Sequence, residues 1–401
     1  MGPLAGLKVI EFAHIMAGPV CGLMLADMGA DVIKVEKVPD GDDTRRTLPP
    51  DIAGESAAFL MMNRNKRGIA VNLKTEDGVN IARRLLSDAD VAIENYRKGT
   101  MERLGLGYDA VKAFNPGIIY AELSGFGRTG PYAERAGFDL IAQGMSGIMS
   151  ITGEGDGGPP TKCGAPLSDI TAGILAAMGV LGAFIHRHKT GEGQRVDTSL
   201  FEAAITHTYW QSAMTFATGV SPGALGSAHP LSAPYQAFEA ADGWITIGAA
   251  NQTNWLRLLE VLERPDLQED PRFADDPGRM ANIDDLVAIL SGIFRQRPAG
   301  EWLERLERSG VPAGPVLDIA DMQADPQTLA RGMVAEAPHT RVGPVKTLGH
   351  PVHYSATPAE ITRGAPLLGE HTLEVLGEHG YGRVEIDKFV AEGAVVVSGN
   401  S

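Results

Sequence analysis

One carboxylate in this sequence stands where it could do chemistry. Asp169 follows a loop at residues 164–168 and precedes an almost unbroken apolar run at residues 170–185. An aspartate at the start of a helix is most often a cap that accepts a free backbone N–H. The same position keeps the carboxylate ionised, and an ionised carboxylate in a water-poor pocket is a competent nucleophile toward a thioester carbonyl. The two roles are compatible, so both stay open at this point.

The apolar run after Asp169 predicts a core helix. Residues 170–185 fall short of the roughly 20 residues that a membrane span needs, so we expect a buried helix of a soluble protein. Small residues recur along it every three or four positions, at Ala172, Ala176, Gly179 and Ala183. Such spacing places them on one face, which would let another backbone, a partner subunit or a ligand come close.

Other patterns for catalysis are weaker. The run GFGRTG at residues 125–130 matches a dinucleotide-binding fingerprint, but Pro131 follows at once and no acid ends a strand about twenty residues further on. No serine is flanked as in the nucleophile elbow of a hydrolase. Histidines occur in pairs only at the end of the apolar run and in a proline-rich stretch near residue 350, so we expect no metal site.

Composition limits the possible partners. A formal charge of −15 and a pI near 5.1 argue against nucleic acid or an anionic membrane as a partner. The densest basic run, residues 63–68, most simply predicts a solvated turn, but with Lys37, Lys74, Arg97 and Arg103 near strand ends it also allows a polyphosphate site. Two cysteines without a Cys-x-x-Cys motif, and an N-terminal stretch without the pattern of a secretion signal, indicate the cytoplasm.

The elements that must position these residues alternate along the first half of the chain. Expected strands lie at 7–12, 31–37, 69–73, 90–95, 117–123 and 194–200, and expected helices at 19–28, 76–89, 101–114 and 201–218. This alternation predicts an α/β fold with a Rossmann-like parallel sheet, whose ligands sit beyond the carboxyl ends of the strands. The loops to watch are therefore 14–18, 37–46 and 95–99.

A chain of 401 residues is long for a single core, so we expect more than one domain. The large domain takes residues 1–220 and is completed by a return segment at residues 326–401. Between them, residues 221–325 contain a hairpin pattern and several helix patterns, which predict a smaller α+β domain.

Several short motifs occur in the order of one enzyme family. They are FAHIMAGP at 12–19, GADVIKVE at 29–36, NRNKR at 63–67, ENY at 94–96, GFG at 125–127, LSDI at 167–170 and QRVD at 194–197. On these runs the chain resembles the family III CoA-transferases, also called the carnitine dehydratase/bile-acid-inducible family, from residue 4 to about residue 377. The resemblance implies a Rossmann-like large domain, a small domain and two ring-shaped subunits interlocked as a homodimer.

The resemblance also implies a mechanism and its substrates. The aspartate matching Asp169 would attack an acyl-CoA to give a mixed anhydride, which CoA thiolate would convert to an aspartyl-CoA thioester. A carboxylic acid would take up CoA by the reverse sequence, without a metal or redox cofactor. By its motifs, the family would contact CoA through His14, Ile15, Ala17, Lys37, Asn72, Leu73, Lys74, Asn95, Tyr96, Arg103 and Arg135.

Some positions bear on the acid substrate. Met16 replaces the glutamine of formyl-CoA transferases, which argues against oxalate and formate, and the Asn-Gln-Thr run at 251–253 stands where those enzymes have a mobile glycine run. The runs GSAH at 226–229 and PYQAF at 234–238 resemble members that use succinyl-CoA and C4 to C6 dicarboxylic acids. The candidates for contacting the acid are Arg45, Arg46, Phe138 and His229.

Two alternatives remain beside the transferase. An α-methylacyl-CoA racemase of the same family exchanges a proton with a His and Asp pair in a Gly-His-Asp motif. This chain has Gly137, Phe138 and Asp139 there, and phenylalanine cannot move a proton. The other alternative is a CoA-binding protein without activity.

Overall fold

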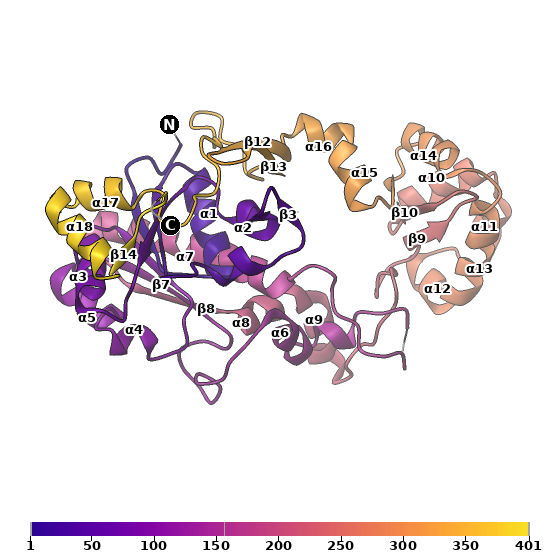
Figure 1. The fold of residues 1–401 in the computed structure, drawn as a ribbon. Helices are drawn as coiled ribbons and strands as arrows, with labels where there is room; N and C mark the ends of the chain where they lie inside the picture. Colours follow the sequence, from indigo (N-terminus) through magenta and orange to yellow (C-terminus); the bar gives the residue numbers. More distant parts are fainter. Residues whose placement is uncertain (1, 156, 400–401) are drawn as a thin grey trace. The chain divides into compact units, whose positions relative to one another are not determined.

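The chain forms two compact units. The computed structural model describes residues 2–155 and 157–399, and Figure 1 follows them from indigo to yellow. The first unit comprises Met1–Ile148, Lys162–Ala213 and Pro326–Ser401, and the second comprises Met149–Thr161 and Met214–Asp325. The second unit therefore also includes residues 149–161 and 214–220, which we had placed in the large domain from the sequence.

A seven-stranded sheet organises the first unit. Its order is β14–β5–β2–β1–β6–β7–β8, with bounds Val395–Val396, Lys66–Val71, Asp31–Glu36, Lys8–Glu11, Val91–Glu94, Ile119–Ser124 and Arg195–Ser199. All neighbouring pairs are parallel except β14 with β5. The predicted α/β class with a mainly parallel sheet is confirmed. From β1 the chain proceeds to β2 on one side and later to β6 on the other, so the strand order reverses between β1 and β6.

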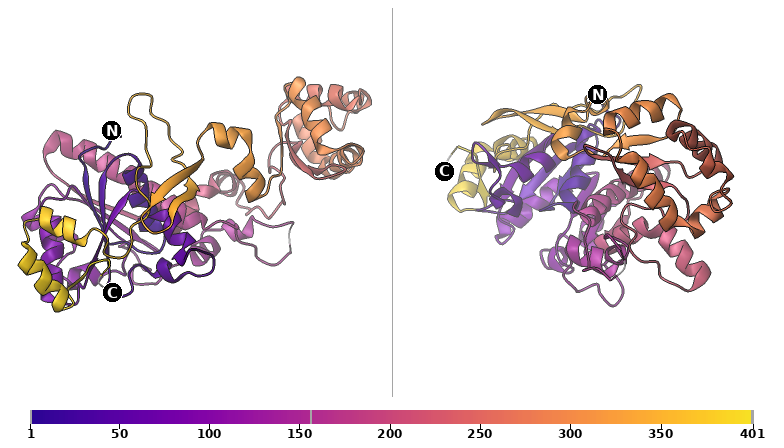
Figure 2. Two further views of the ribbon diagram at one scale, coloured as in Figure 1. Left: turned by 45° about the horizontal axis from the view of Figure 1, so that its top comes forward. Right: turned by 90° about the vertical axis from the view of Figure 1, so that its right-hand side faces the viewer.

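Helices cover both faces of this sheet. One face packs against α1 (Ala17–Asp27), α7 (Leu167–Thr190) and α8 (Leu200–Ile205). The other packs against α3 (Glu76–Leu86), α5 (Tyr108–Phe114), α17 (Thr372–Glu378) and α18 (Arg383–Ala391). In Figure 2 the yellow C-terminal helices and the pink helix α7 accordingly lie on opposite sides of the strands. The inner strands are buried from both sides, which suits the Val, Ile and Ala residues of β1, β2 and β6.

The basic run at residues 63–68 is neither a solvated turn nor a phosphate cradle. β5 begins at Lys66, earlier than the sequence indicated, so the run enters the sheet. Arg64 pairs with Asp27 at 2.5 Å, and Lys66 pairs with Glu11 at 2.8 Å. Both cations are buried beside a buried carboxylate, so the run is not available to bind an anionic ligand.

Helix α7 is longer than the sequence indicated, so the length argument for a soluble core helix was wrong. It has 24 residues and by length and composition alone could cross a membrane. Its small-residue face is nevertheless packed inside the unit. A Cβ added at Gly173 would lie 2.6 Å from the carbonyl oxygen of Ala17, and one at Gly179 would lie 2.6 Å from Cγ1 of Val196. The small residues therefore allow close packing of α1 and β8 and are not an approach for a ligand.

Shorter elements complete the first unit. They are η1 (Asp43–Arg46), β3 (Asp51–Ile52), β4 (Glu55–Ser56), α2 (Ala57–Met62), α4 (Thr100–Arg103), α6 (Asp139–Met145), η2 (Ile148–Ser150) at its boundary, η3 (Thr206–Thr208), α16 (Pro326–Ala330), β12 (Val334–His339) and β13 (Gly343–Leu348). Helix α9 (Tyr209–Thr218) crosses into the second unit.

The second unit has its own sheet and core. An antiparallel sheet has the order β11–β10–β9, with bounds Ala313–Pro315, Trp244–Gly248 and Tyr235–Glu239, and confirms the predicted hairpin. Its helices are α10 (Gln252–Leu262), α11 (Asp266–Glu269), α12 (Asp276–Ala281), α13 (Ile283–Phe294), α14 (Ala299–Arg308) and α15 (Ile319–Ala324). Trp255, Phe273 and Phe294 lie fully buried among them.

Candidate active site

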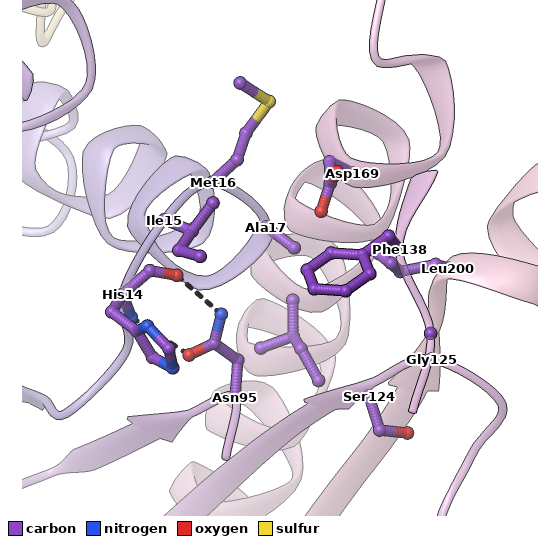
Figure 3. A pocket seen from close by; sticks show the side chains of 12 residues that line it. His14, Ile15, Met16, Ala17, Asn95, Ser124, Gly125, Phe138, Asp169 and Leu200 are labelled. Atoms are coloured by element: carbon purple, nitrogen blue, oxygen red, sulfur yellow. Dashed lines mark hydrogen bonds between the residues drawn. The ribbon is translucent and has the colours of Figure 1, made fainter. Parts of the chain in front are cut away.

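A small pocket lies where the strand order reverses, which is where ligands of such sheets bind. It has a volume of about 130 Å³. Loops that follow β1, β6 and β7 meet there with the first turn of α7 (Figure 3). We call it the inner pocket, and its lining residues are His14, Ile15, Met16, Ala17, Asn95, Leu123, Ser124, Gly125, Gly137, Phe138, Asp169 and Leu200.

A larger pocket adjoins the inner one. This outer pocket has a volume of about 740 Å³, the size of a small-molecule site, and shares His14, Ile15, Asn95 and Phe138 with the inner pocket. Four cationic side chains and two carboxylates line it, namely Arg97, Lys98, Arg103, Arg135, Asp43 and Glu134. In a chain of formal charge −15 this local excess of cations favours an anionic ligand.

Asp169 is the carboxylate of the inner pocket, and it does not cap its helix. It is the third residue of α7, whose N-cap position is Pro166 and whose start has no side-chain cap from that residue. In Figure 3 its side chain extends from α7 toward Ala17 and Phe138. Burial, and next to it the charge of Asp139, raise the pKa of Asp169 to about 6. The cap interpretation was therefore wrong, while an ionisable carboxylate in a largely apolar pocket remains.

Two residues of α6 form hydrogen bonds that fix the segment leading to Asp169. Oδ1 of Asp139 accepts a hydrogen bond of 2.9 Å from the backbone N–H of Ser168, and Oδ2 accepts one of 2.7 Å from Nε2 of Gln143. Oε1 of Gln143 in turn accepts the backbone N–H of Cys163 at 2.9 Å. We had not predicted this support, and its only signal in the sequence is the spacing of four residues between Asp139 and Gln143 on one helix.

The loop after β1 forms the opposite wall. Ile15 has φ of 68°, a left-handed conformation that is uncommon for a β-branched residue. Asn95 accepts the backbone N–H of His14 at 2.9 Å and donates to its carbonyl at 2.7 Å, so its amide is engaged on both sides (Figure 3). Helix α1 then starts without a side-chain cap at Met16. The first-turn N–H groups of a helix have no acceptor within it, and here they begin at Ala17, which lines the pocket.

The third wall depends on a close contact between two glycines. A Cβ on Gly125 would lie 2.7 Å from Cα of Gly137, so the loop after β7 passes directly against the segment that carries Phe138. Phe138 itself is 66% exposed over the pocket. The GFGRTG run is this loop, and the next helix begins only at Asp139, without the helix that a dinucleotide fingerprint requires. Its Arg128 is buried against Glu94.

The structure brings most of the predicted CoA contacts together. His14, Ile15, Asn95, Tyr96, Arg103 and Arg135 line the outer pocket, and Ala17 lines the inner one. Phe138, which we predicted as a contact to the acid substrate, lines both pockets. Lys37 pairs at 2.6 Å with Asp43, a residue of the outer pocket. Asn72, Leu73 and Lys74 follow β5 and line neither pocket. Sequence reasoning had named Arg97 only as a cation near a strand end and had not singled out Lys98 or Asp43.

The predicted contacts to the acid substrate fare differently. Arg45 donates to both carboxylate oxygens of Glu36 at 2.7 Å. Because its guanidinium is already paired, we no longer expect it to contact the acid substrate. Arg46 pairs with Asp40 and Asp43. His229 lies in the second unit, against the ring of Tyr235.

The run at residues 251–253 is not a loose segment either. Asn251 caps α10 by accepting the backbone N–H of Asn254 at 2.8 Å, and Gln252 and Thr253 are the first residues of that helix. No group of three or more His, Cys, Asp or Glu side chains that could hold a metal ion occurs within residues 2–155 and 157–399.

Comparison with known proteins decides the family. A model described as CoA-transferase family III matches residues 4–372. The chain belongs to CoA-transferase family III. This family III CoA-transferase is 41% identical over 382 residues to the succinate–glutarate CoA-transferase of Agrobacterium fabrum, covering 94% of the chain and 95% of the relative. It is 37% identical over 376 residues to the succinyl-CoA:glutarate CoA-transferase of Homo sapiens, covering 94% of the chain and 86% of the relative.

A solved structure agrees with the family assignment. The crystal structure of a CAIB/BAIF family protein from Brucella suis superposes with a TM-score of 0.84 at 42% identity, covering 94% of this chain and 99% of that one. The predicted family and enzyme class are confirmed, since both the family model and the named relatives are CoA-transferases.

Proposed function

We propose that this CoA-transferase moves CoA from succinyl-CoA to a dicarboxylic acid of four to six carbons, with Asp169 as the nucleophile. The relatives of similar length support this substrate class, because those from Agrobacterium fabrum and Homo sapiens are named for succinate or succinyl-CoA and glutarate. A relative from Haloarcula marismortui, 39% identical over 405 residues, is named for succinyl-CoA and mesaconate.

The two joined pockets match the two ends of CoA. The phosphates would lie in the outer pocket, where Arg97, Arg103 and Arg135 offer guanidinium groups for charge-assisted hydrogen bonds. The pantetheine arm would pass Phe138 and Ile15, which line both pockets. The inner pocket has room for little more than the reacting thioester, which supports a position of that group beside Asp169.

The reaction exchanges one thioester for another. A carboxylate oxygen of Asp169 bonds to the carbonyl carbon of succinyl-CoA, the C–S bond breaks, and CoA thiolate leaves behind an aspartyl-succinyl anhydride. The thiolate attacks the aspartyl carbonyl, succinate departs, and an aspartyl-CoA thioester remains. The acceptor carboxylate then attacks this thioester and expels CoA thiolate, which leaves an aspartyl–acceptor anhydride. The thiolate attacks the acceptor's carbonyl carbon, and Asp169 departs as the free carboxylate. No net proton or electron is consumed.

The environment of Asp169 suits this role. With a pKa near 6 the carboxylate is mostly ionised at neutral pH, and it is more basic than an ordinary aspartate, which strengthens it as a nucleophile. The apolar side chains of Ala17, Phe138 and Leu200 limit the access of water that would hydrolyse an anhydride. Uncapped N–H groups at the start of α1 would stabilise the oxyanion that forms during attack.

The observation that carries this proposal is the junction of the Asp169 pocket with the cation-lined pocket. We would incubate the protein with succinyl-CoA, add hydroxylamine and analyse the peptide containing Asp169 by mass spectrometry. We expect a hydroxamate on Asp169 in the wild type and none in Asp169→Asn. Full transferase activity in Asp169→Ala would overturn the mechanism, and a panel of acids would identify the acceptor.

A racemase is disfavoured by the same geometry. Phe138 lines the pocket of Asp169 and stands in the sequence where the Gly-His-Asp motif of a racemase has its histidine. An assay in deuterated water without an acceptor acid separates the two, because only a racemase incorporates deuterium at the α-carbon.

We also propose that the enzyme is a homodimer located in the cytoplasm, as the family resemblance and the cysteine content led us to expect. Exposed apolar side chains along α7 support the dimer. Ile174 and Met178 are 47% and 62% exposed, and Ile185 is 58% exposed. A second copy of the chain would cover this face. His229 and Arg46 remain candidates for the distal carboxylate of the acid.

A further inference from the structure

The loop between β1 and α1 is fixed at every polar backbone group from the carbonyl of Ala13 to the N–H of Ile15. Nζ of Lys34 donates to the carbonyl of Ala13 at 2.8 Å. Asn95 holds both the N–H and the carbonyl of His14. Oδ1 of Asp42 accepts the N–H of Ile15 at 3.0 Å. Side chains from β2, from the loop after β2 and from the end of β6 thus form hydrogen bonds with the backbone of three consecutive residues.

Two of these side chains form a buried ion pair. Nζ of Lys34 lies 2.9 Å from Oδ2 of Asp42, and the side chains are 0% and 1% exposed. Burial alone would lower the pKa of Lys34, but Glu11 and Asp42 hold it above its ordinary value. Burial would raise the pKa of Asp42, but Lys34 and the N–H groups of Thr44 and Ile15 hold it below its ordinary range. Both partners are therefore charged at neutral pH.

The ion pair belongs to a cluster that also holds the start of α1. Lys34 pairs with Glu11 at 3.0 Å, and Glu11 pairs with Lys66 at 2.8 Å. Nζ of Lys66 donates to the carbonyl of Pro19 in the first turn of α1 at 2.8 Å. A Cβ on Gly22 would lie 1.8 Å from Oε2 of Glu11, so α1 passes directly over the cluster because it has glycine there.

This cluster maintains a backbone conformation at Ile15 that is unfavourable for an isoleucine. A β-branched side chain at φ of 68° is disfavoured, so the loop would relax without a restraint. Relaxation would move Ile15 and Ala17, which form the wall opposite Asp169. Small displacements of such a wall are costly for a reaction that depends on placing a thioester against a nucleophile.

We propose that Lys34 and Asp42 are positioning residues of the transferase: as one ion pair they clamp the β1–α1 loop and keep Ile15 left-handed, so that the inner pocket is preformed. Neither residue lines the inner or the outer pocket, and both act through the loop backbone. The inference rests on the proposed function for its consequence in catalysis, whereas the clamp itself can be tested without any substrate.

Asp42→Asn is the direct test, and Asp27→Asn is its matched control. Asp27 is also a buried aspartate paired with a buried cation, Arg64, but it is the last residue of α1, roughly 15 Å along the helix from the loop. Hydrogen exchange is measured by mass spectrometry on peptides covering residues 12–18. We expect the N–H groups of this loop to lose protection in Asp42→Asn and to keep it in Asp27→Asn.

The kinetic arm uses the same proteins. We expect kcat/KM for succinyl-CoA to fall at least about tenfold in Asp42→Asn and to stay within about twofold of wild type in Asp27→Asn. If Asp42→Asn does not fold, Thr44→Val replaces it. This variant removes only the hydrogen bond of 2.8 Å from Oγ1 of Thr44 to Asp42 and should change exchange and kcat/KM in the same direction, but less.

The outcomes separate the clamp from the proposed function. Wild-type exchange and wild-type kcat/KM in the Asp42 or Thr44 variant would overturn the clamp, as would an equal loss of kcat/KM in Asp27→Asn. An inactive wild type with the expected exchange pattern would instead overturn the proposed function and the kinetic consequence, and would leave the clamp as a property of the loop.

Discussion

Asp139 and Ser168 are joined by a hydrogen bond of 2.9 Å that releases the next residue, Asp169, from capping α7. A helix start leaves backbone N–H groups without acceptors, and the carboxylate best placed to accept them is usually one in the first turn. Here a carboxylate from another helix takes that task. Asp169 can therefore face the inner pocket, and the nearby charge of Asp139 adds to burial in raising its pKa.

This arrangement predicts how kcat/KM depends on pH on the acid side of its pH profile, which we call the acid limb. Asp169 must be ionised to attack, so we expect kcat/KM to fall as the pH drops through about 6, the raised pKa of the free enzyme. Asp139→Asn keeps an oxygen for the N–H of Ser168 but removes the like charge, so the limb should move to lower pH. Because burial is the larger cause, we expect a shift of less than about one pH unit. An unchanged limb in Asp139→Asn would contradict the role of that charge.

Asp139→Asn alone also disturbs a hydrogen bond, and a second substitution controls for this. The amide that Asp139→Asn introduces would point its N–H groups at Nε2 of Gln143, which is itself a donor. When Gln143→Glu is added, the new carboxylate accepts from this amide and from the N–H of Cys163. We expect the double variant to regain thermal stability relative to Asp139→Asn. The recovered stability measures the hydrogen bonds, and because Gln143→Glu also carries a negative charge, the acid limb of the double variant should move back toward that of the wild type.

Asp169 should also lower the stability of the folded protein. Its pKa is higher in the folded state, at about 6, than the ordinary 3.8, so the folded state binds the proton more tightly. The resulting loss of folding stability is fully present above pH 6 and decreases as the pH falls from 6 toward 3.8. We therefore expect Asp169→Asn to raise the free energy of unfolding by about 1–2 kcal/mol at pH 7.5 and by less at pH 5. Denaturant titrations at both pH values measure this, and a destabilised Asp169→Asn would contradict it.

The position of Asp169 could be predicted because it depends on local sequence and on topology. Strands β1 and β6 and the loops after them follow from alternating buried runs, and in a parallel sheet these loops meet at one edge. The loop residues His14, Asn95 and Tyr96 were predicted on that basis and by family motif, and they line the outer pocket. Local pattern and family motif together are thus sufficient to locate such a site.

The buried ion pairs that hold the site in place could not be predicted in this way. Lys34 and Lys66 lie in strands that the sheet buries on both faces, and which carboxylate each lysine meets depends on the pairing of β1, β2 and β5. A basic run near a strand end has the same sequence pattern whether it binds phosphate or a buried acid. The burial of those lysines, and the pairing of Arg45 with Glu36, follow only from tertiary neighbours.

The outer pocket predicts a salt-dependent contribution of Arg103 to substrate binding. Arg103 is exposed and its Nη2 donates only at 3.2 Å to Oγ1 of Thr100, so the guanidinium has capacity for a phosphate. We expect Arg103→Gln to raise KM for succinyl-CoA about five- to tenfold at low ionic strength, with a smaller effect at about 0.5 M salt because screening weakens the interaction. Arg383→Gln, a surface arginine paired with Asp387 on α18, is the control and should leave KM unchanged. Equal effects of the two variants would remove Arg103 from the CoA site.

The exposed apolar face of α7 predicts how the proposed dimer can be disrupted. Ile174 and Met178 are one helical turn apart, so two glutamates there would place adjacent charges at the centre of the proposed interface. An interlocked dimer must assemble while it folds, so we expect Ile174→Glu with Met178→Glu to abolish the species of twice the 42.5 kDa chain mass. Val384→Glu is the control, because Val384 is 84% exposed on α18, on the other face of the sheet. Light scattering after size exclusion measures the mass. A double variant that still dimerises at wild-type concentration would show that a second copy does not cover this face, because no interface accommodates two adjacent buried charges without loss of affinity.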